Sequence, residues 1–375
     1  MNLERLLNFM LDKNKGILRL RPTFVARTLY PALGRLGVKR FSVGHRGWLC
    51  ERWMASSVAA VGPTQVGNEG LSEINIKGQR IFLRDALNLI PDRLLGESYA
   101  KAHKGRFGVL TKILDIGYPI PFHLHAQEVH AKRYWNMSPK EEAYYFLDHP
   151  NKGPLPYSHL GLHPETKPDD ILPVLKRWAD DKILDFSPAY RLNTGEGFHI
   201  LAGVPHAPGT ALTLEVQEES DVVTVLQAKV RGKILPKEKV LLNGPRSEEE
   251  ALELINWEVS ADPKFYKKYH IDVERIVDDR KVKESWIFSP KRSRKFSGKE
   301  LILAAGEKIK QDEKGAFLLF VWKGRGRING VRISGRNMYI DELFVSYEAA
   351  QDYEIVNDGR SDLVCYKIFG PDVYH

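Results

Sequence analysis

The sequence of 375 residues contains only two cysteines, Cys50 and Cys365, which lie far apart. Two isolated cysteines exclude a disulfide framework and a cysteine-rich zinc site, so a reducing cytoplasm is the expected compartment. The chain also lacks any run of about 18 apolar residues, and no membrane span is therefore expected. Its first residues mix charge with apolar side chains too often for the apolar core of a secretory signal.

Low-complexity segments are absent as well. The 21 prolines and 30 glycines are spread along the chain, which is typical of many short strands joined by turns. With 43% apolar residues the chain can bury a sizeable core. The net charge of +8 fits an anionic small substrate, nucleic acid or acidic lipid about equally well.

Two basic runs bear on that choice, "KRSRK" (291–295) and "KGRGRING" (323–330). Neither has the regular aromatic interleaving of a single-strand binding groove. The second also lacks the Gly-Lys-Ser/Thr ending of a phosphate loop. Both runs therefore favour solvated faces, and we expect no nucleic-acid partner.

The order of patterns along the chain predicts four segments. A helix and a basic arm are expected over 1–40, followed by a β domain over 41–232 with a helical insertion around 168–182. A helical linker is expected over 233–283, where Ser247 and Glu250 have the spacing of a capping box. Short strand-like runs over 284–375 predict a second, smaller β domain, which has no paired histidines and should be metal-free.

Two histidines one residue apart, His123 and His125, carry the strongest chemical signal. On a strand, alternate side chains emerge from the same face, so the two imidazoles would converge. Downstream, Glu142 begins the apolar run "EAYYFLD", and His206 lies on a Pro/Gly turn. Three imidazoles and one carboxylate form a ligand set for one divalent metal ion, for which zinc is the first expectation and iron, manganese, nickel and cobalt are alternatives.

Glu128 is the rival carboxylate, because it is nearer to His125 in the sequence. Its surroundings, "AQEVHAKRY", are typical of a turn or short helix rather than of a strand returning to the same place. On the strand that follows Glu142, alternation places Tyr144 and Phe146 on the same face as that carboxylate. Glu142 is therefore the preferred ligand.

Several motifs in order resemble those of the type I mannose-6-phosphate isomerase family. "CERWMAS" is similar to the family's Glu-x-Trp strand, and "FGVLTKILD" is similar to its Leu-Leu-x-Lys-Ile-Leu strand. "FHLHAQEVHAKRY" stands where the family has Gln-Val-His-Pro-Asp and a Tyr-Ala-Lys step, and "KEEAYYFLD" resembles its Lys-Thr-Glu-x-Trp-Tyr strand. "AGVPHAPGTALTLEVQEESD" is similar to its Gly-Thr-x-His-Ala run with the following Glu-x-Gln strand.

This resemblance implies a mainly β fold of two cupin (jelly-roll) barrels with helical insertions. It implies a metal-dependent enzyme that interconverts an aldose phosphate and a ketose phosphate. The metal ligands would be His123, in place of the family's glutamine, with His125, Glu142 and His206. Lys132 matches the lysine of the Tyr-Ala-Lys step and would contact a substrate oxygen or phosphate.

The resemblance also implies a role in proton transfer for Glu215 or Gln217, which would face the barrel interior, or for Lys132. It places Trp53 near the site. One position departs from the family, since Val225 stands where an arginine is thought to act at the reacting sugar. A cationic side chain is replaced there by an apolar one.

Three functions follow as hypotheses. The first is a cytoplasmic metal-dependent isomerase of a sugar or sugar phosphate, with proton transfer between C1 and C2 through an enediolate and with no nucleic-acid or membrane partner. The second is a metal-dependent cupin oxygenase, because the same ligand set suits redox metals. The third is a non-catalytic sugar-binding cupin, for which Val225 is the sequence hint.

Overall fold

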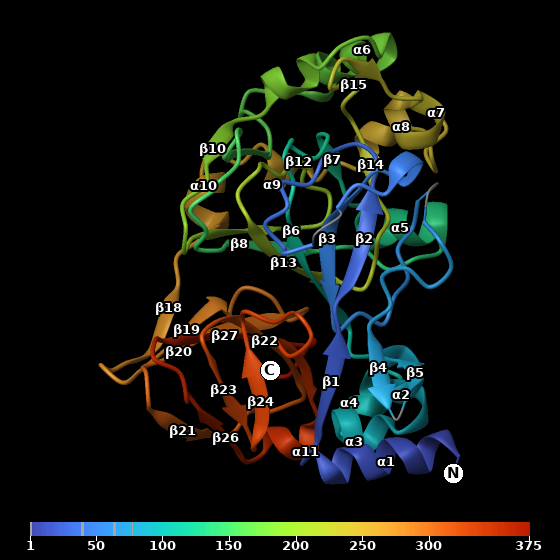
Figure 1. Cartoon of the computed structure of the whole chain (residues 1–375). Coiled ribbons are helices and arrows are strands. Elements are labelled where there is room, and N and C mark those ends of the chain that lie inside the picture. Colours follow the sequence, from blue (N-terminus) through green and yellow to red (C-terminus); the bar gives the residue numbers. More distant parts are fainter. Residues whose placement is uncertain (1, 39–40, 63–64, 77) are drawn as a thin grey trace.

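The computed structural model describes residues 2–38, 41–62, 65–76 and 78–375, and it consists of two stacked β units (Figure 1). The prediction of a mainly β fold is confirmed, and the strand pairs are antiparallel. We call the unit at the top of Figure 1 the upper unit and the other the lower unit. Among the described residues, no helix combines the length and the apolar character that crossing a bilayer requires.

The upper unit contains a seven-stranded and a five-stranded sheet. Side chains of β8, β11 and β9 meet in one apolar cluster, so the inner faces of the two sheets pack against each other. In spatial order the strands are β17 (His270–Ile271), β11 (Gly197–Ile200), β8 (Glu142–Phe146), β13 (Thr213–Glu218), β6 (Val109–Leu114), β3 (Trp48–Met54) and β2 (Thr23–Arg27) in the larger sheet, and β10 (Ala189–Arg191), β9 (Tyr157–Leu160), β12 (His206–Ala207), β7 (His123–Leu124) and β14 (Thr224–Val225) in the smaller one.

The lower unit contains a nine-stranded and a four-stranded sheet, again joined by one apolar cluster. The larger sheet has the order β18 (Glu274–Asp278), β19 (Val282–Phe288), β20 (Ser297–Leu303), β27 (Leu363–Phe369), β22 (Phe317–Lys323), β25 (Glu342–Val345), β1 (Ile17–Arg21), β4 (Glu73–Ile76) and β5 (Gln79–Phe82). The smaller sheet has the order β21 (Lys308–Gln311), β26 (Tyr353–Val356), β23 (Arg325–Ile328) and β24 (Val331–Ser334).

The N-terminal third of the chain contributes to both units. β1 pairs with β25 on one side and with β4 on the other, so strands from the start of the chain extend the lower sheet. β2, only two residues after β1, pairs with β3 in the upper unit. The expected division between 1–40 and 41–232 therefore falls between two strands that pair with each other, and residues 39 and 40 themselves lie outside the described residues.

The two units pack through the outward faces of their larger sheets. Alternate residues of β6, β8 and β13 leave the upper interior and join a cluster with residues of β22, β25 and β27. A buried ion pair crosses the same contact, because Arg52 on β3 donates to both carboxylate oxygens of Asp341 at 2.7 Å and to Glu342 at 3.0 Å. Apolar packing and a multiply bonded guanidinium together hold the units in one arrangement.

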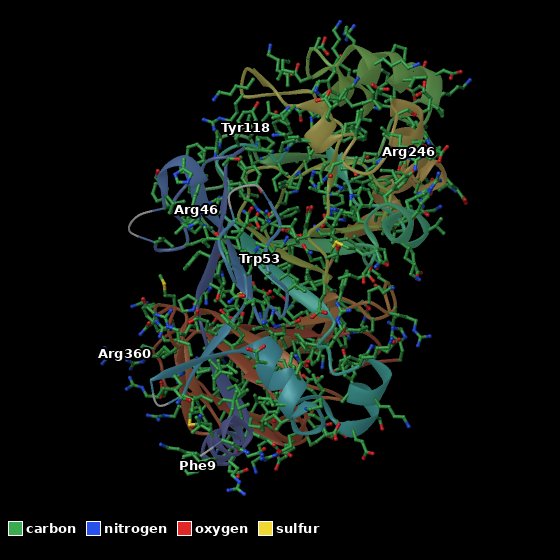
Figure 2. All side chains as sticks on the ribbon, turned by 90° about the vertical axis from the view of Figure 1, so that its right-hand side faces the viewer. Phe9, Arg46, Trp53, Tyr118, Arg246 and Arg360 are labelled. Carbon is green, nitrogen blue, oxygen red and sulfur yellow. The ribbon has the colours of Figure 1, made fainter. Side chains whose placement is uncertain are left out.

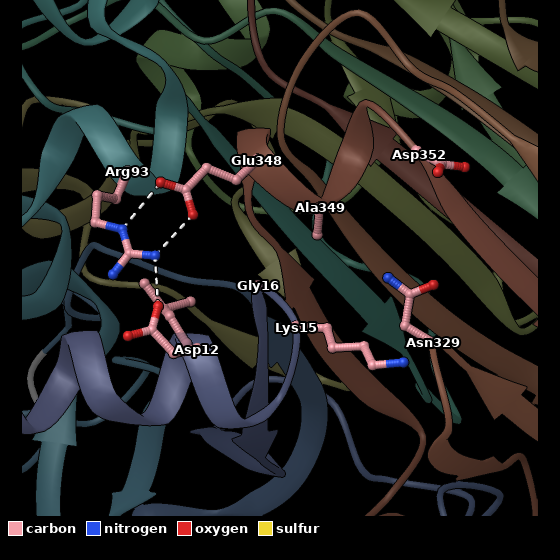
Figure 3. Close-up of a pocket in the computed structure, with 9 residues that line it drawn as sticks. Asp12, Lys15, Gly16, Arg93, Asn329, Glu348, Ala349 and Asp352 are labelled. Atoms are coloured by element: carbon pink, nitrogen blue, oxygen red, sulfur yellow. Dashed lines mark hydrogen bonds and ion pairs between the residues drawn. The ribbon is translucent and has the colours of Figure 1, made fainter.

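Helix α1 (Leu3–Lys13) closes the bottom of the lower unit (Figure 1). Asn2 caps it by accepting from the backbone N–H of Arg5, and one face buries Leu6, Leu7 and Leu11. Arg93 then ties this helix to the C-terminal part, because its guanidinium bonds to Asp12 and to both oxygens of Glu348 (Figure 3). These residues line a cavity of about 410 Å³.

The remaining helices lie mostly around the upper unit. The expected cap at Ser247 is present, since its hydroxyl accepts from the N–H of Glu250 at 3.2 Å and begins α8. A second apolar cluster packs α5, α6 and α8 against the outer side of β7. The helices are α2 (Leu83–Leu89), α3 (Pro91–Leu95), α4 (Glu97–Ala102), α5 (Glu128–Trp135), α6 (Pro168–Arg177), α7 (Lys237–Val240), α8 (Glu248–Glu253), α9 (Trp257–Ser260), α10 (Phe265–Tyr269) and α11 (Tyr347–Ala350).

Candidate metal centre

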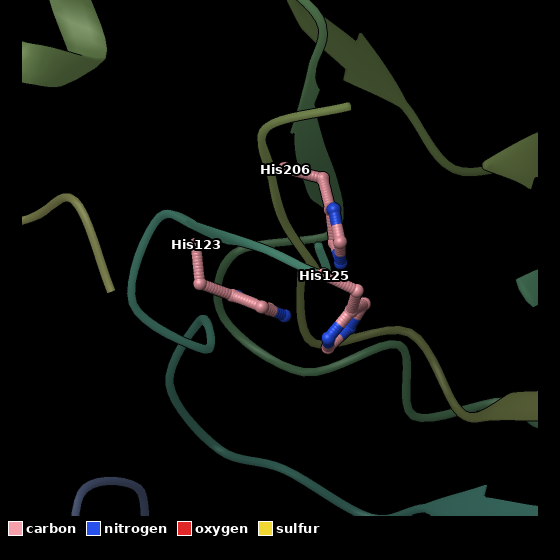
Figure 4. Close-up of side chains that lie close together, drawn as sticks. All are labelled: His123, His125 and His206. Atoms are coloured by element: carbon pink, nitrogen blue, oxygen red, sulfur yellow. The ribbon is translucent and has the colours of Figure 1, made fainter. Parts of the chain in front are cut away.

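Two short neighbouring strands bring three histidines together inside the upper unit. His123 on β7 and His206 on β12 are directly opposite each other in the antiparallel pair, and His125 follows β7. Leu124, between the two histidines of β7, points into the apolar layer under the helices. The alternation expected from the sequence therefore directs both imidazoles of β7 to the inner side. All three side chains are buried and point toward one another (Figure 4).

The backbone determines which nitrogen of each ring is free. Each Nδ1 lies beside a backbone carbonyl oxygen, at 2.7 Å for His123, 2.9 Å for His125 and 2.8 Å for His206. A carbonyl accepts only, so Nδ1 must carry the hydrogen in all three rings, and each Nε2 keeps its lone pair. Metal-ligating histidines are oriented in this way by their outer partners.

The ligand nitrogens of the three histidines lie close together, and one carboxylate lies next to them. One ligand atom from each histidine lies within 4.8 Å of the other two. Glu142 approaches from the opposite sheet, with Oε1 3.0 Å from His206 Nε2 and Oε2 3.3 Å from His125 Nε2. His206 Nε2 is buried without a hydrogen-bond partner, although it faces Glu142 Oε1, while the Lys140 ammonium lies 2.8 Å from Glu142 Oε2. Buried lone pairs that lack a donor are costly unless a cation satisfies them, so the residues fit a divalent ion.

The protonation of these groups also suits a cation. Burial, with the neighbouring His206 and His125, lowers the pKa of His123 well below its usual value, and burial together with Lys140 lowers the pKa of His125 to about 4. Both rings are therefore neutral near pH 7. Burial by itself would raise the pKa of Glu142, but Lys140, His125 and His206 outweigh it and keep the pKa well below the usual range.

Glu142 is held in place by its own strand. It begins β8, and Tyr144, two residues later on the same face, donates its hydroxyl hydrogen to Glu142 Oε1. Tyr144 and Phe146 belong to the apolar cluster inside the unit, while Ala143 and Tyr145 face the lower unit. The sharing of one face by Glu142, Tyr144 and Phe146 follows the alternation predicted from the sequence. This wall of aromatic side chains limits water around the carboxylate.

A second carboxylate, Glu215 on β13, lies next to the cluster and is flanked by two buried lysines. Its Oε1 is 3.4 Å from Lys140 Nζ and 3.6 Å from Lys112 Nζ. Lys140 also donates to His125 Nε2 at 2.9 Å and lies 2.8 Å from Glu142 Oε2. Burial raises the pKa of Glu215 although both lysines oppose this. A buried base and two ammonium groups thus border the candidate metal position.

Sequence reasoning missed Lys140 and Lys112. Lys140 precedes Glu142 by two residues, so an extended backbone places both on one face. Lys112 is the single charge within the fully buried strand β6, directly opposite Glu215 in the ladder. A lone lysine in an apolar strand was the available signal, because such a residue is rarely buried without a partner.

A further ionic layer connects this site to the N-terminal arm. Arg27 on β2 bonds to Glu51 at 2.8 Å and to Asp221 at 3.0 Å, and Lys112 Nζ lies 3.7 Å from Asp221. Trp53 donates its indole N–H to Glu51 at 2.9 Å, and the Lys112 ammonium lies 5.0 Å from the centre of its ring. Lys112 therefore lies between Trp53 and Glu215, and Trp53 is close to the site, as expected from the sequence.

The other sequence-derived candidates divide into two groups, since Gln217 and Val225 lie opposite Glu142 and His123 in their strand ladders whereas Lys132 and Glu128 do not lie in the cluster. Lys132 is on α5 with its side chain 66% exposed, and its ammonium pairs with the equally exposed Glu128 at 2.7 Å. The structure thus places neither residue with the buried cluster. Gln217 is buried on β13 and donates to the backbone carbonyl of Ser220. Val225 on β14 pairs in register with His123, so an apolar side chain stands beside the histidine strand.

The sequence matches no protein-family model and no curated protein. Solved structures do match over nearly the whole chain. A variant of phosphomannose isomerase from Salmonella typhimurium has 14% identity and a TM-score of 0.65, with 95% of this chain and 100% of that one covered. The mannose 6-phosphate isomerase of Bacillus subtilis has 14% identity and a TM-score of 0.64, covering 94% and 99%.

The chain has the fold of the phosphomannose isomerases. The prediction of a two-cupin architecture is thereby confirmed. At this level of identity the phosphomannose isomerase fold alone is shared, and the chemistry has to be argued from the residues of the metal centre.

Proposed function

We propose that this protein is a metal-dependent aldose–ketose isomerase of a phosphorylated sugar, with mannose 6-phosphate and fructose 6-phosphate as the first pair to test. The observation that carries the proposal is the convergence of three buried histidines, each with Nδ1 on a backbone carbonyl, two of which place Nε2 within 3.3 Å of Glu142. The phosphomannose isomerase fold supports the choice of reaction. The motif resemblance described in the sequence analysis implies the same four residues as ligands.

A divalent ion held by His123, His125, Glu142 and His206 would supply a Lewis acid for the sugar carbonyl and for the negative charge of the enediolate. The proton transfers are carried out by side chains of the protein. Glu215 is the proposed base, since its raised pKa strengthens it toward a weakly acidic C–H. It takes the proton from C2 of the open-chain aldose and returns it to C1, while the proton of the O2 hydroxyl passes to O1.

Lys140 and Lys112 position and balance that base. Both ammonium groups are buried, and their distances of 3.4 and 3.6 Å from Glu215 favour its ionised form before the reaction. Lys140 also reaches the edge of the ligand cluster, so it is placed to carry the hydroxyl proton between the two oxygens. Buried, preoriented charges act more strongly there than they would in water.

The test is an interconversion assay with protein loaded with each candidate divalent metal in turn. We expect turnover that disappears when a chelator removes the metal and when His125→Ala removes a ligand. Glu215→Gln should lower kcat by about 10²- to 10⁴-fold while metal content stays the same. The exposed variant Glu128→Gln is the matched control and should keep full activity. Turnover by protein proven free of metal would contradict the proposal.

One observation favours a second candidate. His123 makes the ligand set richer in imidazole than the family pattern, and three imidazoles with a carboxylate also suit iron and other redox metals. A cupin oxygenase would consume oxygen when loaded aerobically with iron. Oxygen consumption without sugar isomerisation would favour this alternative over the isomerase.

A third candidate depends on Val225, which lies beside His123 in register. If turnover requires the arginine side chain that Val225 replaces, the protein would bind a sugar phosphate and leave it unchanged. Saturable binding of mannose 6-phosphate with no product formed under any metal would favour this sugar-binding function.

A further inference from the structure

The four-stranded sheet of the lower unit has a basic outer face. In the β23–β24 hairpin, Arg325 lies opposite Ser334 and Arg327 lies opposite Arg332, so these four side chains share one face of the sheet. The side chains that alternate with them, Ile328 and Ile333, are buried in the core of the unit. The three arginines are exposed on the other face. The run "KGRGRING", which the metal centre leaves unexplained, supplies much of this face.

A pocket of about 360 Å³ lies where this hairpin meets the loop before β27. Three arginines and two serines give it polar groups, while glycines keep part of its wall free of side chains. Figure 2 shows Arg360 at the outer edge of the lower unit, whereas the histidines belong to the upper unit. The lining residues are Gly324, Arg325, Ser334, Arg336, Gly359, Arg360 and Ser361.

Buried hydrogen bonds fix the backbone around the pocket. Asn357 is fully buried, donates to the carbonyls of Leu303 at 2.8 Å and Ser361 at 2.9 Å, and accepts from the N–H of Gly359 at 2.9 Å. The loop that presents Arg360 is therefore anchored to β20. On the opposite side, the N–H of Gly335 donates to the carbonyl of Gly324 at 3.0 Å. The pocket is thus formed in advance of any ligand.

Gly324 is required at its position. Its φ of +80° is unfavourable for other residues, and a Cβ there would lie 2.4 Å from the carbonyl oxygen of Asp362. The close approach of these two backbone segments defines one side of the pocket.

The positive charge in the pocket is largely uncompensated. Arg336 and Arg360 have no carboxylate partner among the residues that the structure describes. Arg325 reaches Asp358 only at 3.9 Å, with both side chains well exposed, and Asp358 is shared with Arg327 at 3.3 Å. Solvent screens such exposed pairs strongly, so one aspartate does little to neutralise three guanidinium groups.

We propose that this pocket binds the phosphate group of a small phosphorylated molecule, at a site separate from the metal centre. Guanidinium groups match phosphate oxygens in a bidentate manner, and the serine hydroxyls can supply further donors. The pocket is large enough for a sugar-sized ligand. None of its lining residues is aromatic, so it offers no stacking platform for the bases of a nucleic acid.

The test measures binding of inorganic phosphate to the full-length, metal-loaded protein by titration calorimetry. The variant is Arg336→Ala with Arg360→Ala. The matched control is Arg5→Ala with Arg280→Ala, which removes the same charge from two exposed arginines elsewhere. We expect the pocket variant to bind phosphate at least about ten-fold more weakly at this site, and the control to bind as the wild type does. Isomerase activity without added phosphate should be the same in all three proteins.

The direct binding readout separates this proposal from the proposed function. Phosphate that binds at the metal centre would persist in the pocket variant and would respond to His125→Ala instead. Equal phosphate binding by wild type and pocket variant would overturn the proposal. So would tight binding of a single-stranded oligonucleotide that depends on Arg336 and Arg360, because the face would then serve a nucleic acid.

Discussion

Both β units bury an ionic cluster between their two sheets, but only one of the clusters is complete. In the lower unit, Lys367 Nζ lies 2.5 Å from both Glu284 Oε1 and Glu313 Oε1, and it also bonds to Tyr353 at 3.1 Å. Lys299 bonds to the other oxygen of Glu313 at 2.6 Å. Two ammonium groups thus balance two carboxylates, and the pairing closes on itself.

The upper cluster has the opposite character. Its three histidines use Nδ1 to bond the backbone, and His125 and His206 bring Nε2 close to Glu142. His206 Nε2 is buried without a hydrogen-bond partner and faces a carboxylate oxygen of Glu142 at 3.0 Å. The comparison teaches that burial of charge alone does not mark a functional site. A buried acceptor such as His206 Nε2, which faces another acceptor with no donor between them, does mark one, because that arrangement is costly unless a bound cation satisfies both atoms.

The largest effect should come from removing one of those lone pairs. His206→Ala should lower metal affinity by more than about 100-fold, since altering only an outer partner of a ligand already costs 10- to 100-fold. Elemental analysis after dialysis measures this. His199→Ala is the matched control, because His199 is also buried in the upper unit but pairs with Glu141 at 2.8 Å. Equal metal content in the two variants would remove the distinction between the clusters.

A substitution in the lower cluster should instead change the stability of the protein. Lys367→Met leaves Glu284 and Glu313 buried with less compensation, and it should lower the free energy of unfolding by about 3 to 5 kcal/mol. Chemical denaturation measures this change, while metal content of the folded protein should be unaffected. Adding Glu284→Gln to Lys367→Met should recover part of the loss. If Lys367→Met alone were as stable as the wild type, the ion pairs of the lower cluster would not contribute to the stability of the fold.

Much of the upper site could be predicted from local sequence. The His123/His125 spacing and the alternation after Glu142 are properties of single strands, and the order of motifs then pointed to His206. The lysines could not be predicted in the same way. Lys112 meets Glu215 only through the β6–β13 register, and Lys132 differs from Lys140 in being on an exposed helix. Which strands pair depends on contacts between residues distant in the chain.

The same limit applies to the domain organisation. The segment expected as a basic arm contains the strand β1, and local periodicity holds no information on the sheet that such a strand joins. β1 and β4 extend the lower sheet because their apolar residues Leu18, Leu20 and Ile74 complete the cluster between the units. Burial of distant partners decides this placement.

The contact between the units offers a pH-dependent comparison. Burial raises the pKa of Glu342 to about 7 in the folded protein, although Arg52 opposes this. Because the folded pKa exceeds the unfolded one, the contribution of Glu342 to stability is fully present below about pH 4.5 and is lost as the pH rises through 7. Glu342→Gln should equal the wild type below pH 4.5 and exceed it by about 3 kcal/mol at pH 8.

Thermal or chemical unfolding of the two proteins from pH 4.5 to pH 8 gives the difference directly. Asp341→Asn is the control, because Asp341 bonds the same guanidinium of Arg52 from the next position in the chain. Parallel stability curves for wild type and Glu342→Gln over this range would show that Glu342 does not titrate within it.

The smallest effect is expected at Lys132, which sharpens the contrast between a buried and an exposed lysine near the site. Its ammonium pairs with Glu128 four residues earlier on α5, and both side chains are about two-thirds exposed. Surface substitutions of this kind change free energies by about 0.5 kcal/mol or less, which is about two-fold in kcat/KM. Lys132→Ala should therefore leave turnover within about two-fold of the wild type, whereas Lys140→Met should abolish most of it with metal still bound. If Lys132→Ala lowered turnover as much as Lys140→Met, Lys132 on α5 would have to contact the substrate. The proposed roles of the buried lysines in the reaction would then not be distinguished from that of an exposed lysine.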